Sequence, residues 1–313
     1  MRFRDLCLTL PVLAALPIAG CGDNKKTAAA DGRLAVYSGI PPVAYLASAV
    51  GGDRVDSKSV LPEGRSPHDY SPGPQEIRGV TGAGLFFTAG MPFENAVCRA
   101  IDPKQTRIVD VTQGIEKIPF EGDDDDDDHD ADHDHEKEAD HHHHDHGAFD
   151  PHVWLSMDNA AVIADRIAGA LTEADPKGAE VYAANLAALK QKLADAKSYS
   201  VKALAPYAGR EFYVYHPAFG YFAKSVGLKQ VGIELGGREV TPAHLAEVIK
   251  KAKADKVKVV FVQPQFNPSS ARALGDAIGG RVAGLDPLAA DIPANVRAMT
   301  DALKEGFSAD GKE

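Results

Sequence analysis

Short apolar runs alternate along this chain with longer segments in which apolar residues recur at helical spacing. Runs of a few apolar residues bounded by turn-forming residues indicate buried strands, whereas apolar positions three and four residues apart indicate helices. The predicted strands are 33–37, 55–60, 85–88, 107–111, 211–215, 229–233, 257–262 and 281–283. Predicted helices cover 41–50 and begin near residues 74, 156 and 241. This alternation predicts an α/β fold with mostly parallel sheets flanked by helices.

One long helix is predicted between the two strand-rich halves, over residues 175–206. Asp175 is a candidate cap, Pro176 suits a first turn, and about 30 residues at 1.5 Å each would make a rod of roughly 45 Å. Its apolar stripe comprises Tyr182, Leu186, Leu189, Leu193 and Ala196. The helix could be the core helix of one domain, but its length and position favour a backbone that joins two similar lobes, 33–174 and 207–313.

The first twenty residues have the pattern of a secretory signal, with Arg2 and Arg4 before an apolar segment, 6–16. That segment is too short to cross a bilayer, which needs about 20 residues. Ile18, Ala19 and Gly20 before Cys21 resemble a bacterial lipobox, which implies cleavage before Cys21 and its lipidation. Residues 21–32 would then form a flexible tether; the alternative is an ordinary secretory signal with a coincidental cysteine. Only Cys98 remains unmodified in the mature chain, so no internal disulfide is expected.

The segment 121–147 has the most biased composition, with fourteen carboxylates, one lysine and eight of the twelve histidines. Its net charge is 1 − 14 = −13, whereas the whole chain carries −11, so everything else sums to +2 and gives no reason to expect a nucleic-acid partner. Almost without apolar side chains, the segment should be disordered. It is either a solvated acidic spacer or, as we favour, an auxiliary weak metal collector. Its histidines are His129, His133, His135, His141, His142, His143, His144 and His146.

Four histidines lie outside this segment, and three of them form, with Asp286, a set of four residues of which at least three occupy positions expected of a binding site. His68 lies in the loop that follows the strand 55–60, His216 follows 211–215, and Asp286 comes just beyond 281–283, while His152 precedes a predicted helix. In open α/β sheets, ligands bind outside the carboxyl ends of the strands. The set of three histidines and one aspartate is therefore predicted to meet in a cleft between the lobes. Taken singly, each residue could instead have a structural role: each histidine could be a surface or hydrogen-bonded residue, and Asp286 could cap a turn. The remaining histidine, His244, is assigned such a structural role.

The segments that carry these residues resemble the motifs of one family, the ZnuA/TroA-like zinc and manganese solute-binding lipoproteins of bacterial ABC importers. They are 66–75 (SPHDYSPGPQ), 150–154 (DPHVW), 215–221 (YHPAFGY) and 285–288 (LDPL). The resemblance covers about residues 34–307. It implies two similar α/β lobes on a rigid helical backbone, with one metal held between them by His68, His152, His216 and Asp286.

Zinc (Zn2+) is the expected metal, because three imidazoles and one carboxylate in four-coordination suit it, whereas manganese (Mn2+) prefers more oxygen ligands. In manganese members of the family the position matching His216 tends to be an acid. Some zinc members have a glutamate where this chain has Pro67, so the fourth ligand here would be Asp286 or water.

The resemblance implies that the protein captures zinc outside the cytoplasmic membrane and delivers it to an ABC permease. The protein is expected to be a monomer, to be anchored to the membrane through Cys21, and not to be an enzyme. Two alternatives are a zinc hydrolase and a zinc buffer. Three histidines with an open fourth position can activate water, but the sequence has no HExxH motif and no evident general base beside a ligand. A buffer would use the acidic histidine-rich segment alone.

Overall fold

The computed structural model describes residues 32–120, 149–234 and 240–310. It contains two four-stranded sheets, and every strand pair in them is parallel. The first has the order β2-β1-β3-β4 and the second the corresponding order β6-β5-β7-β8. Their bounds are β1 Leu34–Ser38, β2 Val55–Ser59, β3 Leu85–Thr88, β4 Arg107–Asp110, β5 Glu211–Val214, β6 Lys229–Gly232, β7 Val259–Val262 and β8 Arg281–Gly284. The prediction of two similar α/β lobes is confirmed.

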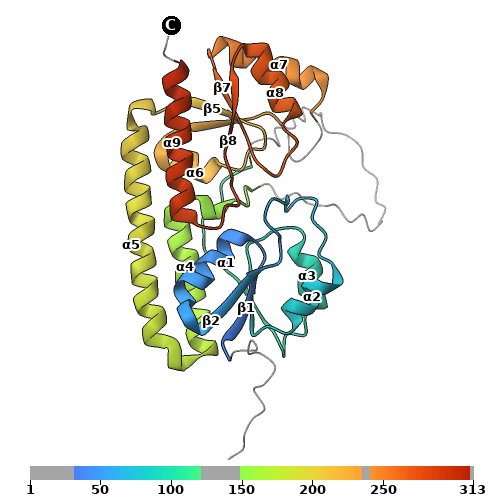
Figure 1. Ribbon diagram of the computed structural model, residues 1–313, viewed down its shortest axis with the longest axis vertical. Helices are drawn as coiled ribbons and strands as arrows, with labels where there is room; N and C mark the ends of the chain where they lie inside the picture. Colours follow the sequence, from blue (N-terminus) through green and yellow to red (C-terminus); the bar gives the residue numbers. More distant parts are fainter. Residues whose placement is uncertain (1–31, 121–148, 235–239, 311–313) are drawn as a thin grey trace, which may run out of the picture.

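Helices flank both sheets (Figure 1). They are α1 Pro41–Gly51, α2 Pro74–Thr81, α3 Glu94–Ala100, α4 Met157–Ala174, α5 Ala179–Leu204, α6 Gly220–Val226, α7 Pro242–Ala254, α8 Ser269–Ile278 and α9 Ile292–Asp310. Thr241 caps α7 as predicted, since its side chain accepts a hydrogen bond from the backbone N–H of His244. Among the residues described, no helix has the length and apolar character that crossing a membrane requires.

The predicted long helix is present as α5, which has short 3-10 turns at both ends, Pro176–Gly178 and Ala205–Tyr207. Its 26 residues correspond to a rod of about 39 Å. It runs along both lobes and packs against α4 beside the first and α9 beside the second (Figure 1). Of the predicted apolar stripe, Leu186 is only partly buried and the other four residues are buried.

The prediction that Asp175 caps this helix is wrong, because its side chain makes no capping hydrogen bond. Its carboxylate accepts hydrogen bonds instead from Arg54 Nε and Nη2, at 2.7 and 2.9 Å, and from the Tyr182 hydroxyl, at 2.7 Å. A bidentate arginine is a stronger donor to a carboxylate than a backbone amide. Asp175 therefore joins the start of the long helix to the segment before β2.

Trp154 connects the two lobes at the level of the sheet edges. Its side chain is fully buried, and its indole Nε1 donates a 2.7 Å hydrogen bond to the carbonyl of Pro287. Trp154 leads into α4, whereas Pro287 follows β8 of the second sheet. This bond holds the loop after β8 against the segment that carries His152.

Glu94 is a buried carboxylate that organises the loop after β3. It is 3% exposed and accepts hydrogen bonds from the backbone N–H groups of Ala89, Gly90 and Met91 at 2.9–3.0 Å. Burial raises its pKa to about 7 against the opposing effect of these amides. Glu94→Ala should lower the free energy of unfolding by about 3 kcal/mol, because three amides lose their buried acceptor. Urea denaturation measures this loss; Glu94→Gln, which keeps one acceptor oxygen, should lose less, and an unchanged midpoint for the alanine variant would contradict the account.

Candidate metal centre

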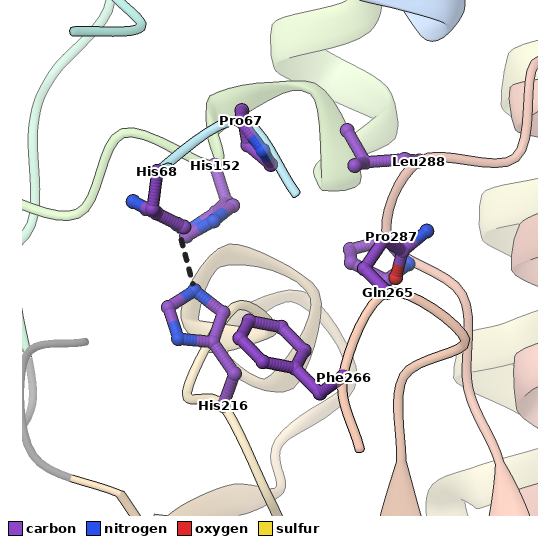
Figure 2. A pocket seen from close by; sticks show the side chains of 8 residues that line it. All are labelled: Pro67, His68, His152, His216, Gln265, Phe266, Pro287 and Leu288. Carbon is purple, nitrogen blue, oxygen red and sulfur yellow. Dashed lines mark hydrogen bonds between the residues drawn. The ribbon is translucent and has the colours of Figure 1, made fainter. Parts of the chain in front are cut away.

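Three histidines from distant parts of the chain meet between the lobes (Figure 2). One side-chain nitrogen from each of His68, His152 and His216 lies within 4.8 Å of the others. The Nε2 atoms of His68 and His216 are 3.1 Å apart, and the ring centroids of His152 lie 5.8 and 5.2 Å from those of His68 and His216. Nitrogens this close can all reach one metal ion at the roughly 2.0–2.1 Å typical of zinc–imidazole bonds.

Each histidine is placed by a different element. His68 lies in the loop between β2 and α2, where its backbone N–H donates to Ser66 Oγ at 3.3 Å. His152 precedes the 3-10 turn Val153–Leu155 that leads into α4. His216 comes two residues after the end of β5, at the sheet edge where parallel α/β folds bind ligands. The strand-end rule had selected both His68 and His216, and the structure places their side chains next to each other.

A glutamine from the neighbouring strand fixes the backbone of His216. Gln263, just beyond β7, accepts a 3.1 Å hydrogen bond from the His216 N–H and donates one of 2.6 Å to its carbonyl. Because both backbone groups of His216 are paired with one buried side chain, the histidine is held in register with β7.

The Nδ1 atoms of two histidines face buried carboxylates. His152 Nδ1 is 2.7 Å from Asp150 Oδ1, and His216 Nδ1 is 2.6 Å from Glu234 Oε1. An ionised carboxylate only accepts hydrogen bonds, so in a neutral imidazole each of these Nδ1 atoms carries the proton and the Nε2 atom of the same ring keeps its lone pair. The burial of His216 lowers its pKa from the usual value, and the hydrogen bond to Glu234 acts in the opposite direction.

Asp150 and Glu234 are functional candidates that the sequence analysis missed. Glu234 comes directly after the predicted strand 229–233, so the strand-end rule that selected His216 could have found it. Asp150 precedes His152 by two residues, and its Oδ1 also accepts the His152 backbone N–H at 2.8 Å, which is the geometry of an Asx turn. The sequence signal that could have identified Asp150 is an aspartate two residues before a candidate ligand histidine.

The walls of the pocket around the histidines are largely apolar (Figure 2). The lining residues are Pro67, His68, His152, His216, Gln265, Phe266, Pro287 and Leu288. Phe266 stacks on His216, with ring centroids 5.2 Å apart and planes inclined by 30°. The Phe120 ring lies 6.4 and 6.1 Å from the rings of His152 and His216. Apolar walls exclude water, which strengthens electrostatic interactions inside the pocket.

Asp286 lies beside this pocket and is bonded to one of its walls. Its Oδ1 accepts hydrogen bonds from Gln265 Nε2, at 2.8 Å, and from the Leu288 N–H, at 2.9 Å. Within the described ranges, the cluster of candidate ligands contains the three histidines and not Asp286. The amide oxygen of Gln265 is buried and has no hydrogen-bond partner there. The role of Asp286 as fourth ligand therefore stays a prediction.

The remaining predicted residues lie elsewhere. His244 is on α7, and its Nε2 contacts the Ile233 carbonyl at 3.0 Å, in keeping with its structural assignment. Cys21 and the eight histidines of the segment 121–147 lie outside the described residues. The flanks of that segment are described: Pro119 forms an antiparallel bridge with Phe149, and the Asp150 N–H donates to the Ile118 carbonyl. Both flanks thus end beside the metal centre.

The comparisons with known proteins identify the family of this chain. A sequence model of the family described as "Zinc-uptake complex component A periplasmic" (ZnuA) matches residues 36–306. The chain belongs to the ZnuA family. It is thus a metal solute-binding protein of an ABC importer, and the prediction that it is not an enzyme is confirmed.

Relatives of this chain are named for two different metals. The high-affinity zinc uptake system protein ZnuA of Haemophilus ducreyi is 35% identical over 311 residues, with 96% of each chain covered. The manganese-binding lipoprotein MntA of Halalkalibacterium halodurans is 26% identical over 288 residues, covering 90% of this chain and 88% of the relative. A crystal structure of ZnuA superposes with a TM-score of 0.76 at 30% identity, covering 88% of this chain and 99% of the other.

Proposed function

We propose that this chain captures one zinc ion between its lobes and delivers it to an ABC permease. The observation that supports the proposal is the convergence of His68, His152 and His216, two of them with their Nδ1 atoms on buried carboxylates. With His152 and His216 in this tautomer, their Nε2 atoms and a nitrogen of His68 would form a three-imidazole ligand set, which suits zinc better than manganese. Asp286 or water would complete four-coordination.

Manganese is the second candidate metal, because relatives of similar identity are named for it. Competition on the purified mature chain separates the two candidates. Zinc should bind tightly at one site per molecule, and a hundredfold excess of manganese should leave it in place. Displacement of zinc by manganese at that excess would overturn the choice of metal.

A lipid anchor at Cys21 would keep the protein at the outer face of the cytoplasmic membrane, close to its permease. Several relatives are named as lipoproteins, which supports this proposal. Cys21→Ser should release the protein from the membrane fraction without changing zinc binding, because the anchor and the metal centre are separate parts of the chain. Fractionation followed by immunoblotting tests this, and retention of the variant in membranes would exclude the lipid anchor.

The segment 121–147 would collect metal weakly and supply it to the pocket. Deleting it should leave one tight zinc site and remove several weak ones, because the pocket ligands are preorganised, whereas the composition of the segment predicts that binding would have to order its backbone, at roughly 1–2 kcal/mol per residue. The deletion should also slow zinc loading at low zinc and low ionic strength, because the carboxylates of the segment raise the local cation concentration and salt screens this effect. Calorimetry and stopped-flow on both forms measure these effects. Loss of the tight site on deletion would place that site in the segment.

A further inference from the structure

We infer that Asp150 and Glu234 are positioning residues of the metal site, one for His152 and one for His216, and that their paired negative charges adapt the pocket to a divalent cation. The inference rests on the proposed function, because it assigns roles around the same ion. Both carboxylates are almost completely buried, at 1% and 3% exposed, as are both imidazoles, at 2%. Burying an anion is unfavourable unless it is paired, so each of these two carboxylates needs its hydrogen-bonded histidine to offset a substantial desolvation penalty.

The position of Glu234 follows from the topology of the second sheet. β5 and β6 are adjacent and parallel, so the residues beyond their carboxyl ends lie at the same edge. The Glu234 N–H donates to the Tyr215 carbonyl at 3.0 Å, which fixes the glutamate backbone beside His216. Its carboxylate then reaches the Nδ1 of that ring. This contact sets both the tautomer and the direction in which the Nε2 lone pair points.

Asp150 is fixed from both lobes. Its N–H donates to the Ile118 carbonyl at 2.8 Å, and its own carbonyl accepts a 3.0 Å hydrogen bond from the Tyr221 hydroxyl of α6. A methyl group at Gly220 would come within 2.7 Å of Asp150 Oδ2, so the absence of a side chain at that position leaves room for the carboxylate. With this backbone, Asp150 can bond both the N–H and the Nδ1 of His152.

The charge balance gives these carboxylates a second effect. Three neutral imidazoles supply no charge, whereas Asp150 and Glu234 together supply −2 directly behind two of the rings. Each carboxylate polarises the N–H it accepts and makes the opposite nitrogen a stronger donor to a metal. The two charges match those of a divalent ion, which is often the largest local charge in such a site. Removing either charge should weaken the hold on zinc even when the ring stays in place.

Two variants at each position separate charge from placement. Glu234→Gln and Asp150→Asn keep an oxygen that can accept the Nδ1 proton, whereas Glu234→Leu and Asp150→Ala remove the acceptor. Zinc affinity is measured by chelator competition, and the ligand field is measured from the visible absorption of the Co2+-loaded protein. Glu94→Gln is the matched control, because it neutralises another buried carboxylate whose hydrogen bonds go to Ala89, Gly90 and Met91.

We expect Glu234→Leu and Asp150→Ala to weaken zinc binding by about 100-fold and to change the Co2+ spectrum, and the amide variants to lose about 10-fold with a spectrum close to the parent. The control should retain both the parent affinity and the parent spectrum. If the leucine and alanine variants match the parent in both, the positioning role is excluded. A parent protein without a tight site would instead refute the proposed function, so the two failures are distinguishable. If a variant does not fold, the amide form, which preserves shape, decides the question.

Discussion

Replacing His216 with alanine should remove the tight metal site and weaken zinc binding on the order of 1,000-fold, equivalent to about 4 kcal/mol. The substitution deletes one of three converging nitrogens and leaves Glu234 as a buried carboxylate without its imidazole partner. Both consequences act against binding a cation in a defined geometry. His152→Ala should behave similarly, because His152 has the same kind of carboxylate contact. Competition with a chromogenic chelator measures the loss.

His244→Ala is the matched control for this substitution. His244 lies in the same lobe and is only part-buried, and its Nε2 contacts a backbone carbonyl instead of the cluster. Its removal should leave zinc affinity within about twofold of the parent, as expected for a residue outside the site. A His216→Ala variant that binds zinc as tightly as His244→Ala would show that the three histidines are not the metal centre.

Zinc should be released steeply as the pH falls through the imidazole range. Each ligand must be neutral to coordinate, and an unperturbed histidine has a pKa of about 6.5. Burial lowers the pKa of His216, so protons compete for that ring only at more acidic pH and metal is retained somewhat below the ordinary value. Once the pH is below the pKa of all three ligands, affinity should fall by up to about tenfold per unit for every proton that metal must displace.

A chelator titration from pH 8 to pH 4 measures this dependence. Zinc affinity must fall as the pH falls, because acidification adds protons to the same nitrogens that hold the metal. The protein without residues 121–147 serves as the control, since it reports the pocket alone. An affinity that does not change over this range would contradict an imidazole site.

The fold could be predicted from the sequence because short strand-like runs alternate with segments whose apolar residues recur at helical spacing. Thr241 and Pro242 mark the start of α7 by local chemistry alone, and the apolar stripe of α5 follows helical spacing. Asp175 was misassigned because its true partner, Arg54, is 121 residues away in the chain. A cap is a local signal, whereas this ion pair depends on how the lobe folds back onto the helix.

Strand ends predicted part of the site, whereas His152, which precedes a helix, was selected as a member of the set and through the motif 150–154. His68 and His216 were found because the loops beyond parallel strands converge at one edge, and the same rule would have given Glu234. Asp286 satisfies the rule as well, yet its carboxylate accepts the Leu288 N–H, as the turn-capping alternative expected, and bonds the side chain of Gln265, a contact that the sequence does not indicate. The choice between zinc and manganese is also beyond sequence similarity, because relatives with either name match this chain over most of its length.

Anomalous diffraction from crystals of the zinc-loaded protein tests the central claim most directly. The pocket should contain one strong zinc peak at about 2.0–2.1 Å from a nitrogen of each of His68, His152 and His216. The Nδ1 atoms of His152 and His216 should remain on Asp150 and Glu234. A zinc peak bound elsewhere, with the three histidines free of metal, would contradict the account.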